Sequence, residues 1–218
     1  MEISEPELDL VVNLVRREAF AGLLRGAPVN VSHVAARRRV PLERLRAALD
    51  QLVAAGAAEV AGDGEINGAH GLTTRTTRHA IVLGPRVLHT WCALDAVGIP
   101  VALALDAIAI TTCPTCGARL SVPVRAGRAA GLPFVLWLPT GPYAHLTRDF
   151  CSSANLFCDV AHAGTWRRQA GDPQGRLVAV AEVEDIARMA WADVAREGRK
   201  ELGVDVVHDD NGPDPASN

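Results

Sequence analysis

The sequence lacks the features that would direct a protein to a membrane or across one. Its acidic first ten residues contain neither the basic region nor the apolar core of a secretory signal. The longest apolar stretch without a charge, residues 96–105, has ten residues, whereas a membrane-spanning helix needs about 20. We therefore expect a cytoplasmic protein with no membrane-spanning segment.

An excess of positive charge is missing too. The net charge is −3 at pH 7, and ten arginines within the first 80 residues are matched by ten acidic side chains. Because sequence-independent attraction to phosphate needs a net basic surface, no nucleic acid is expected as a partner. The hydrophobic share of 49% is enough for one substantial core or two modest ones, so most of the chain should be folded.

The five cysteines all lie between residues 92 and 158. Their number is odd and no signal peptide is evident, so a framework of disulfides is not expected. The pattern indicates reduced thiols that carry out metal or redox chemistry.

The first third of the chain has the pattern of a winged helix-turn-helix unit. Apolar residues recur at helical spacing over residues 8–24, Ser32 can cap a short helix that runs to about Arg38, and Pro41 suits the first position of a third helix. Residues 58–82 then predict a strand pair around a glycine turn. We therefore predict an N-terminal domain over residues 1–82.

The rest of the chain predicts a catalytic domain over residues 83–206, in which flanking helices surround a small mixed β-sheet, so the fold class is α+β. Residues 88–101 are mostly apolar and predict a buried helix that is broken near Pro100. A last helix is expected over residues 184–202, and the tail, residues 207–218, is expected to be disordered. Strands are predicted at residues 107–112, 119–124, 133–139 and 177–183.

The segment Trp91-Cys-Ala-Leu-Asp95 is the most informative for chemistry. On a helix, Cys92 and Asp95 lie about one turn apart on the same face, so a thiol and a carboxyl can meet one bound atom. As purely structural residues they would be a buried thiol and a surface charge, but an unpaired carboxylate within an apolar helix is costly. Burial raises the pKa of a carboxyl, which lets it donate a proton near neutral pH.

Three segments, in this order, resemble the organomercurial (alkylmercury) lyase family. Residues 88–96 are similar to the segment with the family's first catalytic cysteine and its aspartate, and Asp149-Phe-Cys151 resembles the segment with the second cysteine. Thr112-Cys-Pro-Thr-Cys-Gly resembles the strand turn between them, whose first cysteine is structural in the family. Residues 26–79 also resemble the family's winged-helix part, so the similarity covers about residues 15–200.

The resemblance implies that the protein breaks carbon–mercury bonds. Cys92 and Cys151 would hold mercury, a soft metal that favours thiolate, and Asp95 would pass a thiol proton to the carbon. The products would be a hydrocarbon and Hg(II) held by two cysteines, and no cofactor is needed. The implied partners are the organomercurial substrate and, as acceptors of Hg(II), small thiols or a mercuric reductase, as in mercuric resistance and detoxification.

The remaining cysteines depart from this scheme. Cys113 and Cys116 form one Cys-x-x-Cys pair, which looks like half of a zinc knuckle, and Cys158 with His162 could complete a site of four ligands. The sequence has no second Cys-x-x-Cys pair. These thiols could equally be buried structural residues or spare ligands for a soft metal.

Two other functions fit parts of the pattern. A DNA-binding regulator that senses soft metals would use the winged helix, with Arg37, Arg38 and Arg39 beside the recognition-like helix. Such a regulator should keep the polar face of the third helix open, whereas a lyase can pack that face against its catalytic part. A lyase-like protein that acts on another soft metal or carbon–element bond would keep the same three site residues.

Overall fold

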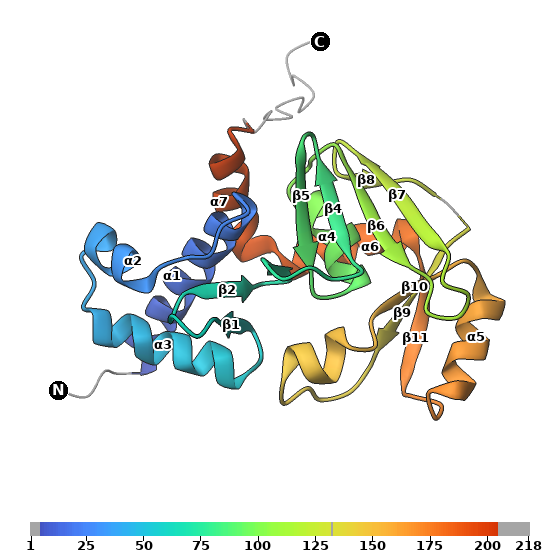
Figure 1. The fold of residues 1–218 in the computed structure, drawn as a ribbon, viewed down its shortest axis with the longest axis horizontal. Coiled ribbons are helices and arrows are strands. Elements are labelled where there is room, and N and C mark those ends of the chain that lie inside the picture. The colour runs from blue at the N-terminus through green and yellow to red at the C-terminus, as the bar shows by residue number, and fades with distance from the viewer. Residues whose placement is uncertain (1–4, 132, 205–218) are drawn as a thin grey trace, which may run out of the picture.

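The structure is a computed structural model that describes residues 5–131 and 133–204. The tail predicted at residues 207–218 lies outside these ranges. Helices and two antiparallel sheets make up an α+β architecture (Figure 1). Within the described ranges, no helix combines the length and the apolar character needed to cross a bilayer.

Three helices gather at one end of the molecule (Figure 1): α1 (Glu5–Leu24), α2 (Val31–Arg38) and α3 (Leu42–Ala54). The side chain of Asn30 caps α2, because its oxygen accepts hydrogen bonds from the backbone N–H groups of Ser32 and His33 at 2.9 and 3.1 Å. Asn30 is therefore the N-cap, and the expectation that Ser32 caps this helix is wrong. Asparagine and serine cap about equally well, so the residue types alone do not choose between them.

The larger sheet has eight strands in the order β1-β2-β3-β5-β4-β6-β7-β8. Its strands are β1 (Ala58–Val60), β2 (Ile66–Ala69), β3 (Leu72–Thr73), β4 (Ala80–Leu83), β5 (Arg86–Thr90), β6 (Ala107–Thr112), β7 (Arg119–Arg125) and β8 (Arg128–Ala129). Strands β4 and β5 form a hairpin in which Leu83 faces Arg86. The sheet is consequently continuous past residue 82, where the sequence predicts a domain boundary.

The smaller sheet has β9 (Val135–Pro139) between β10 (Asn155–Phe157) and β11 (Gly175–Ala179). Helix α5 (Val160–Gln169) packs on it through Trp166, whose ring lies 5.9 Å from that of Trp137 and 5.4 Å from that of Phe157. All strand pairings of both sheets in the described ranges are antiparallel. The expected mixed sheet is therefore wrong; antiparallel neighbours can be joined by short turns such as the one between β4 and β5.

Helix α4 (Ala93–Ala102) lies against the larger sheet and is buried over residues 93–101. The helix predicted over residues 88–101 is wrong in its first part, because residues 86–90 form β5 and pair with both β4 and β3. Cross-strand pairing outweighs the helical spacing of the apolar residues there. Pro100 lies inside α4 and does not break it; complete burial of the surrounding residues offsets the backbone hydrogen bond that proline cannot donate.

The C-terminal segment forms two helices, α6 (Val183–Ala190) and α7 (Ala192–Leu202), where one helix over residues 184–202 is expected. The break falls at Trp191, whose backbone has φ −113° and ψ 13°. The indole of Trp191 packs on Gly98 of α4, where an added Cβ would lie 2.5 Å from a ring carbon, and its N–H donates to the His70 carbonyl at 2.9 Å. These two contacts fix the elbow between α6 and α7.

The first and last described helices pack against each other. Gly198 of α7 lets α1 approach closely, since a Cβ there would lie 2.9 Å from the ring of Phe20 and 3.1 Å from Leu24. An ion pair of 2.6 Å between Arg25 and Glu201 lies at the edge of this contact. Residues close to both ends of the described chain therefore share one part of the core.

Candidate active site

The start of α4 holds Cys92 and Asp95 together. Cys92 is the N-cap residue, with extended backbone (φ −147°, ψ 177°), and its N–H donates a hydrogen bond of 3.0 Å to the Asp95 carboxylate. The backbone N–H of Asp95 points back toward the Cys92 sulfur. The positive end of the helix dipole stabilises a carboxylate at Asp95, and it would stabilise a thiolate at Cys92. The spacing of the two residues thus brings them together as predicted, although Cys92 precedes the helix.

Cys151 reaches the same place from a distant part of the sequence. It ends η1 (Thr147–Cys151), a π-helical turn that is followed by the short strand β10. The first N–H of α4, from Ala93, donates to the carbonyl of Ala154 at 3.1 Å, and the N–H of Ala154 donates to that of Phe150 at 3.1 Å. The first bond ties the segment with Cys151 to the start of α4, and the second holds the turn within that segment.

The three predicted site residues converge. The two sulfurs and a carboxylate oxygen of Cys92, Asp95 and Cys151 all lie within 4.8 Å of one another. The exposed fractions of these residues are 0%, 6% and 6%, so water has little access to the cluster. This separation suits two thiolates on a single soft metal ion, with a carboxyl beside it.

The electrostatics of the cluster favour its protonated forms. Burial raises the pKa of Asp95 from 3.8 to about 7, while hydrogen bonds from Cys92 oppose this rise. Burial also raises the pKa of the Cys92 thiol well above its usual range, and a hydrogen bond with Cys151 and the charge of Asp95 add to the effect. The site can therefore hold protons near neutral pH.

An apolar pocket of about 300 Å³ opens beside the cluster. Asp95 and Cys151 line it, whereas Cys92 is fully buried and does not. The other walls come from α4, the loop before Cys151, and α6, and are mostly apolar; they include Leu94, Tyr143, Leu146, Phe150, Ile186 and Trp191. Such a pocket suits a small hydrocarbon group attached to an atom held by the sulfurs.

The turn between β2 and β3 adds two residues that the sequence patterns do not single out. Gly71 has a positive φ of 93°, and a Cβ on it would lie 2.6 Å from a carboxylate oxygen of Asp95. His70 lines the pocket and lies 3.3 Å from the Asp193 carboxylate, with its ring edge-on to Phe20. Close packing against Asp95 requires a glycine at position 71, but this requirement produces no periodic pattern in the sequence. Only the folded structure therefore reveals the contact.

The second group of candidate ligands also converges, at a different place. The ligand atoms of Cys113, Cys116, Cys158 and His162 lie within 4.8 Å of one another. The first two residues flank the turn between β6 and β7, and the last two flank the start of α5. None of the four belongs to the cluster around Cys92.

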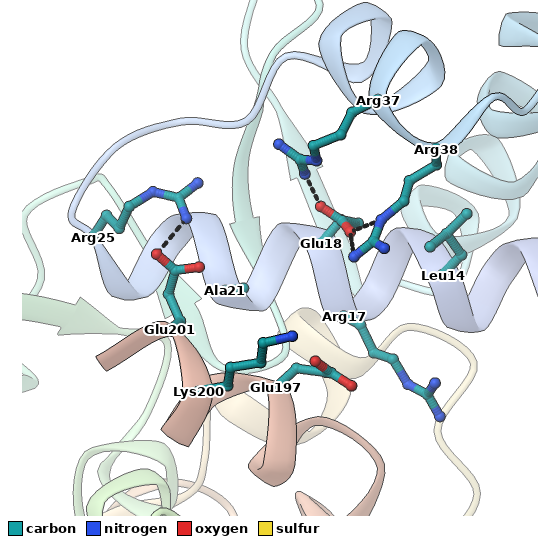
Figure 2. A pocket seen from close by; sticks show the side chains of 10 residues that line it. All are labelled: Leu14, Arg17, Glu18, Ala21, Arg25, Arg37, Arg38, Glu197, Lys200 and Glu201. Atoms are coloured by element: carbon teal, nitrogen blue, oxygen red, sulfur yellow. Dashed lines mark hydrogen bonds and ion pairs between the residues drawn. The ribbon is translucent and has the colours of Figure 1, made fainter. Parts of the chain in front are cut away.

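A larger cavity, of about 430 Å³, lies between α1, α2 and α7 and is lined mainly by charged side chains (Figure 2). Arg37 and Arg38 both form ion pairs with the buried Glu18, and Arg25 pairs with Glu201 (Figure 2). Two of the three arginines expected beside a recognition helix therefore share one carboxylate within the protein, which cancels one of their two charges. This cavity holds none of the candidate catalytic residues.

The polar face of α3 does not separate the two predicted functions. It stays exposed, as expected for a regulator, but it carries Glu43 and Asp50 as well as Arg46. Charges of both signs on this face give no net basic surface for phosphate.

Comparisons with known proteins identify a family and a shared fold. A family model described as alkylmercury lyase matches residues 72–192, a range that includes Cys92, Asp95 and Cys151. A solved structure described as "Crystal structure of the mercury-bound form of MerB2" aligns with 89% of this chain and 96% of its own, with 22% identity and a TM-score of 0.75. At this identity the likeness establishes the shared fold. No protein with curated function matched the chain.

Proposed function

Because this chain belongs to the alkylmercury lyase family, whose model matches more than half of it, we propose that Cys92, Asp95 and Cys151 are the residues with which it cleaves the carbon–mercury bond of organomercurials. The observation that carries this assignment is the buried convergence of two sulfurs and one carboxylate within 4.8 Å. The apolar pocket beside them supports it, because the organic group of the substrate needs an apolar surface.

Substrate capture begins at Cys151, because this thiol lines the pocket. The Cys151 sulfur displaces the small thiol that carries R–Hg⁺, and its proton leaves on the departing thiolate. The Cys92 sulfur then binds the same mercury, and its proton passes to the neighbouring Asp95 carboxylate, whose pKa of about 7 allows it to accept. Mercury is now held by two thiolates, which raise the electron density on the attached carbon.

Cleavage is the transfer of this proton from Asp95 to the carbon. The electron pair of the carbon–mercury bond becomes the new carbon–hydrogen bond, so a hydrocarbon RH leaves and Hg²⁺ stays on Cys92 and Cys151. Burial favours the step, since the neutral carboxylic acid is the form that an apolar environment stabilises. The chain's own residues supply every proton that the step consumes.

The bound Hg²⁺ must then be removed by stronger or more numerous thiols. We propose that small thiols and a mercuric reductase accept it, which places the protein in mercuric resistance and detoxification. Such thiols are abundant in a reducing compartment, so we propose a cytoplasmic location, and the five free cysteines agree with it. No nucleic-acid partner is proposed, because the exposed face of α3 carries charges of both signs and Glu18 cancels one of the two charges of Arg37 and Arg38.

The N-terminal part has a structural role in this proposal. Three helices followed by the β1–β2 hairpin are the order of a winged helix-turn-helix unit, and we propose that residues 1–82 form such a unit as a scaffold. Its contribution to the site is the turn with His70 and Gly71, which forms one wall of the pocket. Residues 83–206 are proposed as the catalytic part, which contains all three reacting side chains.

Incubation with phenylmercury in excess thiol tests the proposal. The wild-type protein should release benzene, detected by gas chromatography, and should retain Hg²⁺. The control is Asp50→Asn, which removes an exposed carboxylate of α3 outside the site and should release benzene at the same rate. If the protein retained intact phenylmercury and released no benzene, it would be a mercury-binding protein and not a lyase, and the assignment of Asp95 as proton donor would be wrong.

A further inference from the structure

A second thiol cluster lies outside the catalytic site and takes no part in the steps above. Its members are Cys113, Cys116, Cys158 and His162, one ligand atom of each lying within 4.8 Å of all the others. The sulfurs of Cys116 and Cys158 are 3.5 Å apart. This distance is well beyond a disulfide bond of about 2.05 Å, and all five cysteines of the chain are free.

The β6–β7 turn has the backbone arrangement of a metal-binding knuckle. Cys113 follows β6, its N–H donates to the Ala118 carbonyl at 2.8 Å, and its carbonyl accepts from the N–H of Gly117 at 2.9 Å. Gly117 has a positive φ of 75°, which lets the chain turn back into β7. The backbone N–H groups of Thr115, Cys116 and Cys158 lie near the Cys113 sulfur, an arrangement that favours a thiolate.

The other half of the cluster is held in place from the α5 side. Asp159 caps α5, accepting a hydrogen bond of 2.8 Å from the His162 N–H, and this fixes His162 in the first turn. The hydroxyl of Thr115 donates to the His162 carbonyl at 2.8 Å, which links the two halves directly. The ligands are thus positioned by backbone contacts from two separate elements.

The imidazole of His162 has a free coordination position. Its Nδ1 atom is buried and has no hydrogen-bond partner among the described residues, and the Asp159 carboxylate is 3.9 Å away. A buried polar nitrogen without a partner is costly unless something binds it. Neutral imidazole nitrogen is a common zinc ligand.

We propose that Cys113, Cys116, Cys158 and His162 form a structural zinc site that ties the β6–β7 turn to the start of α5. A tetrahedral zinc with bonds of about 2.3 Å to sulfur places its ligand atoms about 3.8 Å apart, which the cluster reaches with small side-chain movements. Three sulfurs and one nitrogen favour zinc over hard cations, which prefer oxygen. Four protein ligands leave no open position, so the site is structural and not catalytic.

The location of the site gives it a consequence for the reaction centre. Cys158 follows β10, the strand that begins four residues after Cys151, so a metal there would restrain the chain just beyond the pocket. The zinc would not contact the substrate. The inference depends only on these four side chains and would stand even if the proposed lyase chemistry failed.

Metal analysis of the purified protein tests the proposal without any organomercurial. Protein expressed in zinc-supplemented medium should contain about one zinc per chain by mass spectrometry of the metal. His162→Ala should lose most of it, whereas His33→Ala, which removes an exposed histidine, should keep it. The double variant Cys92→Ala/Cys151→Ala should also keep it, since those thiols belong to the other cluster.

Two further measurements guard against loss of folding in the variants. His162→Cys replaces the nitrogen ligand with a fourth thiolate and should restore about one zinc per chain. Cobalt added to the zinc-free wild type should give the strong visible absorption of a tetrahedral thiolate site, and Cys158→Ser should weaken it. Wild-type protein with less than about a tenth of an equivalent of zinc, and no tetrahedral cobalt spectrum under reducing conditions, would overturn the proposal.

Discussion

Replacement of Asp95 by asparagine should make the protein more stable and nearly inactive. The carboxyl is 6% exposed, and burial raises its pKa from 3.8 to about 7. Asparagine has the same shape and can still accept the Cys92 N–H, so the start of α4 is preserved. It carries no charge and can neither accept the thiol proton nor deliver it.

The effect on stability has a definite sign. Because the folded protein binds the Asp95 proton more tightly than the unfolded chain, the free energy of unfolding falls as the pH rises between about 4 and 7. Each pH unit between the unfolded pKa of 3.8 and the folded pKa of about 7 lowers the free energy of unfolding by about 1.4 kcal/mol. Above pH 7 the total decrease is on the order of 4 kcal/mol. Asp95→Asn lacks this loss, so its advantage over the wild type should be small near pH 4 and grow to a few kcal/mol at pH 8.

Urea unfolding of both proteins at pH 4, 6 and 8 measures this effect. The difference between their free energies of unfolding cancels the contributions of the other titrating groups. In single-turnover experiments, Asp95→Asn should still capture phenylmercury but release benzene about 10²–10⁴-fold more slowly. Parallel stability curves for the two proteins would refute the raised pKa. Cleavage at the wild-type rate would refute the role of the carboxyl as proton donor.

The remaining predictions concern the thiols, the packing on the carboxyl and the pocket. Cys92→Ser should abolish cleavage, because a hydroxyl is a poor ligand for soft mercury, and hydrocarbon release in the presence of excess thiol measures it. Gly71→Ala should lower kcat by at least about tenfold, because the new Cβ would lie 2.6 Å from Asp95 Oδ1. Gly64→Ala is the control for backbone strain, because Gly64 also has a positive φ, of 81°, but has open space around it. Equal losses in these two variants would contradict the packing argument. Ala190 of α6 also lines the pocket, so Ala190→Leu should narrow it and raise KM more for phenylmercury than for methylmercury. Equal changes in the two KM values would count against this pocket as the site of the organic group.

Local features of the site were predictable from the sequence, whereas its long-range features were not. The spacing of Cys92 and Asp95 brings them together whether Cys92 lies in a helix or just before it. The approach of Cys151 depends on a hydrogen bond between Ala93 and Ala154, and no spacing rule indicates it. From the sequence alone, only the family resemblance joins Cys151 to the other two.

The errors in the predicted secondary structure also arise from long-range contacts. The residues of β5 have apolar spacing that suits a helix, but their partners in β3 and β4 lie elsewhere in the chain and their pairing outweighs local preference. The break at Trp191 is set by packing on Gly98 and by the hydrogen bond to His70, both distant in sequence. Periodicity reports which residues are apolar, but it does not report which surface they will cover.

The contact between α1 and α7 affects how the protein can fold during synthesis. Phe20 and Leu24 are completely buried, and Gly198 of α7 packs directly against both. Ribosomes add about 5–20 residues per second, so roughly 10 to 30 s pass between the synthesis of α1 and that of α7. During that time its apolar face is open to chaperones and to other nascent chains. The final core therefore forms only after translation has nearly ended, and a chain cut short before α7 should aggregate even though all three proposed catalytic residues are present.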